Sequence, residues 1–148
     1  MNFFDLFIAS LAGTSAMTLF MYILSFITGY KTKVINVLGT LLTFQAGPNG
    51  ELSTSPLAVS IGSIAHYAIG FAFTLVYGWI WWKELLQPDW WSILILGTIS
   101  GILAVGFWGT VLKIHPRPPR VKLSAYLIAI FFAHYVFVWG VVLGFKFL

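Results

Sequence analysis

The stretch LAVSIGSIAHYAIGFAFTLVYGWIWW, residues 57–82, decides the class of fold. It contains no charged residue and no proline, and it exceeds the roughly 20 apolar residues with which a helix crosses the hydrocarbon core of a bilayer. Three further stretches, at about residues 3–28, 90–112 and 123–145, are equally apolar, with charged residues only at their ends. The ten-residue alternation of a transmembrane barrel is not seen. The sequence therefore predicts an all-α integral membrane protein with four transmembrane helices.

The composition of the whole chain agrees with this class. Of its 148 residues, 59% are hydrophobic and 8% are charged, whereas a soluble domain carries about 25% charged residues. At this length, one bundle covering residues 1–148 is expected as a single domain. The chain has no cysteine, which excludes disulfides, thiolate metal sites and cysteine nucleophiles. The net charge of +4 comes from loops beside the spans, which favours anionic lipid head groups over nucleic acid as a partner.

The connections between the spans add two predictions. The short connection 83–89 makes the second and third spans run antiparallel, and tryptophans around it predict an aromatic belt at the head-group layer. In the longer connection between the first two spans, apolar residues recur at helical spacing, and polar residues face the other way. This pattern predicts a short amphipathic helix at about residues 32–45, lying in the membrane interface.

Basic side chains concentrate in the first and third connections, which share one side of the membrane. We expect the following residues to contact lipid head groups: Lys31, Lys33, Arg117, Arg120 and Lys122. By the positive-inside rule these connections face the cytoplasm, so both termini are predicted outside it. Helical spans are typical of a plasma membrane or a bacterial inner membrane, where we expect this multi-pass protein.

A local pattern recurs in the second and fourth spans, as Ala65-His66-Tyr67 and Ala133-His134-Tyr135. Each histidine lies roughly ten to twelve residues into its span, which is on the order of 15–18 Å deep and close to the bilayer midplane. The recurrence predicts two repeated helical hairpins in the same orientation. Small residues at steps of four predict the faces on which helices pack. These positions are Gly62, Gly70 and Gly78 in the second span, and Gly97 and Gly101 in the third.

The two histidines near the midplane leave three interpretations open. In the first interpretation, the histidines are axial ligands of a b-type haem, and Gly62 and Gly70 beside His66 leave room for the porphyrin. Tyr67 and Tyr135 are neighbouring ligand candidates. Alternatively, each histidine hydrogen-bonds a neighbouring helix, or the pair belongs to a pore or ligand site. No Cys, Asp or Glu lies at membrane depth to complete a coordination shell, so no other metal site is predicted.

Hydroxyl side chains offer a second functional pattern, in which a narrow path for a small solute or an ion has a polar wall. The candidates for this wall are Ser10, Thr14, Thr18, Ser63 and Thr74. Against ion-coupled transport, no carboxylate is buried in the spans to exchange a proton. The four acidic residues lie at the chain terminus or in loops, and no pair of them favours general acid–base catalysis, so no catalytic residue is predicted.

The sequence thus favours a small non-catalytic membrane protein that acts as a packing or ligand-binding unit, as a homo-oligomer or an accessory subunit of a larger membrane complex. The alternatives are a b-type haem protein with His66 and His134 as axial ligands, and a pore or transporter for a small solute or ion.

Overall fold

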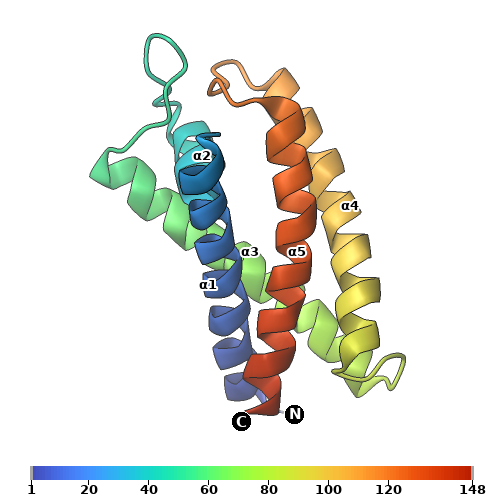
Figure 1. The fold of residues 1–148 in the computed structure, drawn as a ribbon. Helices are drawn as coiled ribbons and strands as arrows, with labels where there is room; N and C mark the ends of the chain where they lie inside the picture. Colours follow the sequence, from blue (N-terminus) through green and yellow to red (C-terminus); the bar gives the residue numbers. More distant parts are fainter. Residues whose placement is uncertain (1, 148) are drawn as a thin grey trace.

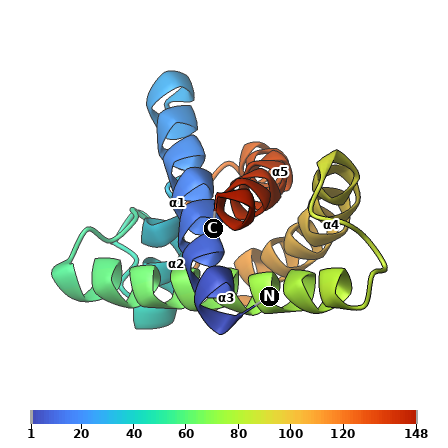
Figure 2. The same cartoon turned by 90° about the horizontal axis from the view of Figure 1, so that it is seen from below.

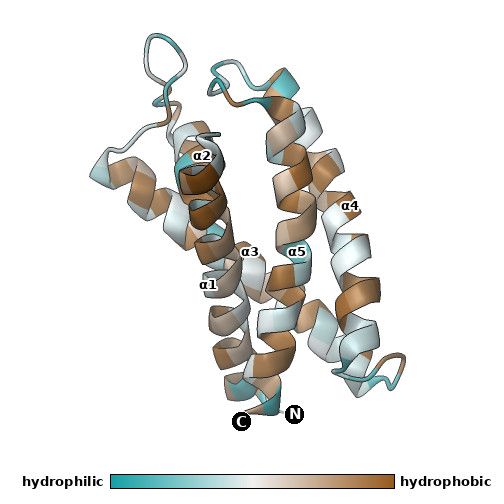
Figure 3. Ribbon diagram, viewed as in Figure 1, coloured by the Kyte–Doolittle hydropathy of each residue, from teal (hydrophilic) through white to brown (hydrophobic). Residues whose placement is uncertain are grey.

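The computed structural model describes residues 2–147, and within these residues the regular secondary structure is all helical, without strands (Figure 1). The helices are α1 (Phe3–Thr28), α2 (Val34–Thr43), α3 (Pro56–Trp82), α4 (Trp90–Ile114) and α5 (Leu123–Lys146). All but α2 are long and apolar enough to cross a membrane. In Figure 3, the long helices are mostly hydrophobic or near neutral in hydropathy, and the most hydrophilic residues gather in the connections and at helix ends. The predicted class is confirmed to this extent: the described chain is all-α, and four of its helices are long and apolar enough to span a membrane.

Short polar residues explain where three of the long helices begin. The Asn2 side chain accepts a hydrogen bond from the Asp5 backbone N–H at 2.8 Å, in a capping box at the start of α1. Ser55 caps α3 directly before Pro56, and Asp89 accepts hydrogen bonds from the first N–H groups of α4. These caps satisfy N–H groups that have no partner within the helix.

The helices α1 and α5 are antiparallel and pack most extensively of all pairs (Figures 1 and 2). Glycines bring their backbones together: a Cβ atom added to Gly140 would lie 2.8 Å from the Cα of Gly13, and one added to Gly144 would lie 2.9 Å from the Cα of Ala9. Because lipid removes the hydrophobic drive for association, such close van der Waals contact is a main source of helix–helix affinity in a bilayer.

The helix α3 runs obliquely across the bundle, from α2 on one side to α4 on the other (Figures 1 and 2). It packs against α1 and α2, whereas α4 packs against α5, so α3 and α4 diverge from their connection and hardly touch. Beside that connection Trp81 donates a hydrogen bond from Nε1 to the Ser92 hydroxyl at 3.0 Å. Trp81 is buried there, whereas the four other tryptophans around the connection are exposed.

A helix is present where residues 32–45 predict one, and α2 is largely enclosed by protein. After α1 the chain turns back alongside that helix, because the Thr32 hydroxyl donates a hydrogen bond to the Met21 carbonyl at 2.8 Å. α2 then lies against α3, where a Cβ added to Gly62 would lie 2.8 Å from the Gly39 nitrogen. Its location in the membrane interface stays a prediction.

The first and third connections meet at one end of the bundle. The Gly50 carbonyl accepts a hydrogen bond from the Arg120 N–H at 2.7 Å, and Lys122 donates one to the Tyr30 hydroxyl at 3.0 Å. The start of α1, the end of α5 and the connection 83–89 lie at the other end (Figure 1). The predicted hairpins, α1 with α3 and α4 with α5, both contain packed pairs, but the most extensive contact joins α1 to α5. The repeat therefore stays a prediction.

We expect Gly13→Ala to destabilise the protein, because the new Cβ would overlap the Val141 side chain and lie 2.7 Å from the Phe137 carbonyl oxygen. Overpacking of this kind costs about 1–3 kcal/mol. Gly106→Ala is the matched control, since its added Cβ has no atom within 4 Å. Thermal unfolding in detergent should show a lower melting temperature for Gly13→Ala alone. Equal melting temperatures would contradict the importance of this contact.

Candidate functional site

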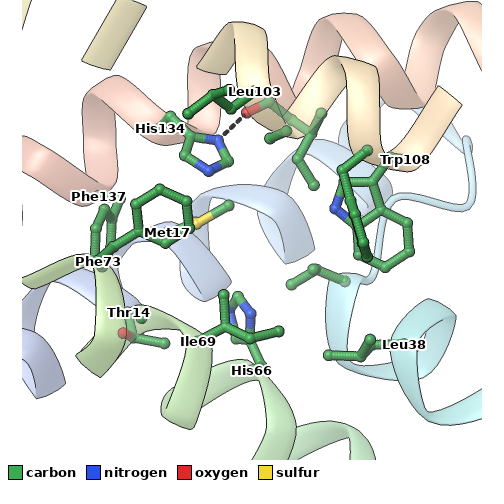
Figure 4. A pocket seen from close by; sticks show the side chains of 15 residues that line it. Thr14, Met17, Leu38, His66, Ile69, Phe73, Leu103, Trp108, His134 and Phe137 are labelled. Atoms are coloured by element: carbon green, nitrogen blue, oxygen red, sulfur yellow. Dashed lines mark hydrogen bonds between the residues drawn. The ribbon is translucent and has the colours of Figure 1, made fainter. Parts of the chain in front are cut away.

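A cavity of about 440 Å³ lies inside the bundle, and all five helices contribute to its wall (Figure 4). The wall is mostly aliphatic and aromatic, with a few polar groups, which is the usual make-up of a site for a small molecule. The lining residues are Thr14, Met17, Val34, Leu38, His66, Ile69, Gly70, Phe73, Leu103, Ala104, Phe107, Trp108, Ile130, His134 and Phe137.

The imidazole of His134 projects from α5 into the cavity (Figure 4). Its Nδ1 lies 2.7 Å from the carbonyl oxygen of Ile130, one turn earlier in the same helix. Because a carbonyl oxygen only accepts hydrogen bonds, Nδ1 carries the ring proton. A buried imidazole with no carboxylate in the cavity wall is neutral, since an unpaired charge at this depth is costly. The other ring nitrogen, Nε2, is therefore left as an acceptor.

His66 reaches the cavity from α3 and has the opposite tautomer. Its Nε2 lies 3.1 Å from the Thr18 hydroxyl, and that hydroxyl donates its own proton to the Thr14 carbonyl at 2.7 Å. Thr18 is consequently the acceptor for His66, and Nε2 carries the imidazole proton. This leaves Nδ1 of His66 as an acceptor, and no group within residues 2–147 donates a hydrogen bond to it.

The two histidines face the cavity from different walls (Figure 4). No hydrogen bond joins them in the described part of the chain. The ring of Phe73 packs edge-on against His134, with centroids 6.1 Å apart. Trp108 forms a further wall, with its indole nitrogen on the cavity side, and this N–H has no acceptor among residues 2–147. The cavity wall thus contains two imidazole acceptors, the Trp108 N–H donor and the hydroxyl of Thr14, and is otherwise apolar.

The cavity opens between α3 and α4, the two neighbouring helices that diverge. Three of its lining residues are substantially exposed there: Ile69 of α3 is 45% exposed, and Leu103 and Phe107 of α4 are 58% and 57% exposed. All three are apolar. A protein whose long helices cross a bilayer would turn this opening toward lipid hydrocarbon.

Of the hydroxyl candidates, Thr14 lines the cavity, and its buried oxygen has no hydrogen-bond partner among the described residues. That oxygen lies against Gly70, where an added Cβ would overlap it. Thr18 and Thr74 donate to carbonyls of their own helices. Ser10 is buried and Ser63 is partly buried, and both lie outside the cavity wall.

The two candidate tyrosines lie outside the cavity and make similar contacts. The hydroxyl of Tyr67 is 2.9 Å from that of Ser15, which joins α3 to α1. The hydroxyl of Tyr135 is 2.7 Å from that of Thr98, which joins α5 to α4. Each tyrosine therefore ties the second helix of a predicted hairpin to the first.

The candidate packing glycines lie at helix contacts or are buried. Gly62 meets α2, and Gly70 meets Thr14 of α1. Cβ atoms added to Gly97 and Gly101 would lie 2.8 Å and 2.9 Å from aromatic side chains of α5. Gly78 is buried in α3.

The basic candidates gather at the end of the bundle where the first and third connections meet. Arg117 and Arg120 line a second, open pocket of about 370 Å³ beside residues 46–50. The ammonium group of Lys33 lies 5.6 Å from the centre of the Tyr22 ring, and that of Lys122 lies 4.7 Å from the centre of the Tyr30 ring. Lys31 is exposed.

Sequence reasoning did not include several residues of the cavity, among them Val34 and Leu38 of α2 and Trp108 of α4. For Trp108 the sequence contained one indication: it lies far along α4 from the tryptophans around the connection 83–89, so it does not belong to the predicted aromatic belt there. The contribution of α2 had no such signal, since an amphipathic pattern does not specify what its apolar face contacts.

Comparisons with protein-family models, with curated proteins and with solved structures give no match for this chain. Among residues 2–147, no group of three or more His, Cys, Asp or Glu side chains is arranged to hold a metal ion.

The tautomers can be tested by nitrogen NMR of the protein in detergent micelles or nanodiscs, because the chain has three histidines. At neutral pH we expect His134 to carry its proton on Nδ1 and His66 to carry its proton on Nε2, both uncharged. Thr18→Ala removes the acceptor for His66 and should let that ring populate both tautomers, while His134 stays unchanged. A charged His66, or a proton on its Nδ1 in the unaltered protein, would disprove this assignment.

Proposed function

We propose that this protein binds a lipophilic small molecule in the cavity between His66 and His134. The observation that carries the proposal is the pairing of two unused imidazole acceptors with an apolar, partly aromatic wall. These nitrogens face the cavity, and an acceptor that is kept from water without a donor costs about 1–3 kcal/mol. A histidine that served packing alone would be more stable with both of its ring nitrogens hydrogen-bonded to protein. A bound molecule that donates hydrogen bonds would instead pair with the free nitrogen of each ring.

The opening between α3 and α4 supports a ligand that comes from the membrane. Its exposed rim residues are apolar, so a molecule dissolved in lipid would pass them without losing favourable solvation. A small ion or a polar solute would leave water to cross the same rim, at a large desolvation cost. Ligand binding is therefore favoured over the pore.

A b-type haem is the second candidate, because imidazoles from two helices face one cavity. Nε2 of His134 would be free to coordinate iron, but Nε2 of His66 is engaged with Thr18. The cavity wall contains no Lys or Arg to pair with the two propionates. These residues fit haem less well than they fit an uncharged ligand.

The sequence supports further parts of the proposal. The basic end of the bundle, with Arg117 and Arg120, would face the cytoplasm and anionic lipid head groups, with both termini outside. A plasma membrane or a bacterial inner membrane suits such a protein. The two-hairpin repeat, the interfacial location of α2 and a homo-oligomeric or accessory role belong to the same proposal.

Filling the cavity should abolish binding. In lipid nanodiscs, a lipophilic photolabel, 3-trifluoromethyl-3-phenyldiazirine, should label the peptide around residues 103–108 saturably. Ala104, in the cavity wall, is 8% exposed, and Ala104→Phe should reduce the saturable labelling at least about tenfold. Ala68→Phe, on the exposed surface of α3, is the matched control and should leave it unchanged. Uniform, non-saturable labelling that neither variant alters would refute ligand binding, provided that both variants keep the melting temperature of the parent.

The visible absorption spectrum separates the two candidates. After expression with ample haem, we expect the purified protein to show no Soret band. A Soret band that His66→Ala and His134→Ala each remove would replace the lipophilic ligand with haem as the proposed occupant.

A further inference from the structure

The hydrogen-bonding direction of the cavity is set by the protein groups that already pair with one nitrogen of each histidine. His134 donates its ring N–H to the Ile130 carbonyl, and His66 donates its ring N–H to the Thr18 hydroxyl. Both rings therefore offer lone pairs to whatever the cavity holds. A ligand with acceptors alone, such as a quinone, an ester or an ether, would leave both lone pairs unpaired, whereas a ligand with hydroxyl donors would satisfy them.

The remaining walls favour an aromatic ligand. Phe73, Phe107, Trp108 and Phe137 line the cavity, and aromatic rings pack on one another edge-on or offset with a gain beyond that of burial alone. The indole N–H of Trp108 faces the cavity without an acceptor among residues 2–147 (Figure 4). A hydroxyl group accepts one hydrogen bond while it donates another, so a phenolic oxygen is able to serve both an imidazole and the indole.

The ligand is also uncharged. The cavity wall contains no Lys, Arg, Asp or Glu, so a carboxylate, phosphate or ammonium group would have no counter-charge there. A phenol has a pKa of about 10 and is neutral at physiological pH. It also partitions into lipid, on which the opening between α3 and α4 would border.

We propose that the cavity selects a lipid-soluble phenol, of the dihydroxybenzene or hydroquinone class, and binds it through hydrogen bonds from its hydroxyl groups to His66 and His134. This inference rests on the lipophilic-ligand function proposed above and adds the chemical class of the ligand. The cavity distinguishes ligands by the number of hydrogen-bond donors that they carry, so a hydroquinone binds in preference to the corresponding quinone.

The test compares two probes of nearly equal shape, 4-hexylresorcinol and its dimethyl ether, which lacks both donors. Each competes with the diazirine photolabel for the peptide around residues 103–108 of the full chain in nanodiscs. We expect 4-hexylresorcinol to compete at a concentration at least about tenfold lower than the ether, because the ether leaves the imidazole acceptors unpaired. His134→Phe, which keeps an aromatic ring but removes one acceptor, should reduce this preference to within about threefold, and Ala68→Phe should preserve it.

The outcomes separate the two proposals. Saturable labelling of the cavity peptide, with equal competition by both probes in the parent protein, would overturn the phenol assignment and leave ligand binding intact. Better competition by the ether would overturn it in favour of a ligand that only accepts hydrogen bonds. Absence of saturable labelling would refute the proposed function itself. The comparison of the two probes in the parent protein needs no variant, so it holds even if His134→Phe fails to fold.

Discussion

The contact between the backbones of α1 and α5 is the constraint on which the bundle depends. Lipid tails are as apolar as leucine side chains, so these helices gain from association mainly where their surfaces fit closely. Gly13, Gly140 and Gly144 provide that fit. With this pair fixed, α3 packs across α1 while α4 packs along α5. Because α3 and α4 pack against different helices, they diverge, and the space between them forms the cavity and its opening.

Most of the fold was predictable because its signals are local. Apolar length set the four spans, and Asn2, Ser55 and Asp89 mark the starts of three of them through their own side-chain hydrogen bonds. The enclosure of α2 was not predictable in this way. An apolar helix face satisfies lipid and protein equally well, so periodicity cannot tell them apart. The polar side of α2 found protein partners instead of water: Asn36 donates a hydrogen bond to the Ser53 carbonyl, and Thr40 accepts one from the Ser53 N–H.

The candidate site likewise has some features that the sequence could predict and others that depend on tertiary structure. Residue spacing placed His66 and His134 at similar depth, and the structure brings both rings to one cavity. Spacing could not show which nitrogen of each ring is free. That depends on Thr18, in another helix, and on the local geometry that turns His134 toward the Ile130 carbonyl. The contribution of α2 to the wall depends on a chain reversal after α1, which is a tertiary feature with no periodic signal.

If the cavity binds the proposed ligand, the apolar rim at Ile69, Leu103 and Phe107 determines which concentration controls its occupancy. A site that opens sideways into hydrocarbon equilibrates with the mole fraction of its ligand in the surrounding lipid, and the aqueous concentration matters only through partitioning. Loading then becomes a two-dimensional encounter, and dilution of the membrane with additional lipid lowers occupancy at constant total ligand. A protein that binds its ligand in this way would respond to the composition of its own bilayer and would respond to the water on either side only through partitioning.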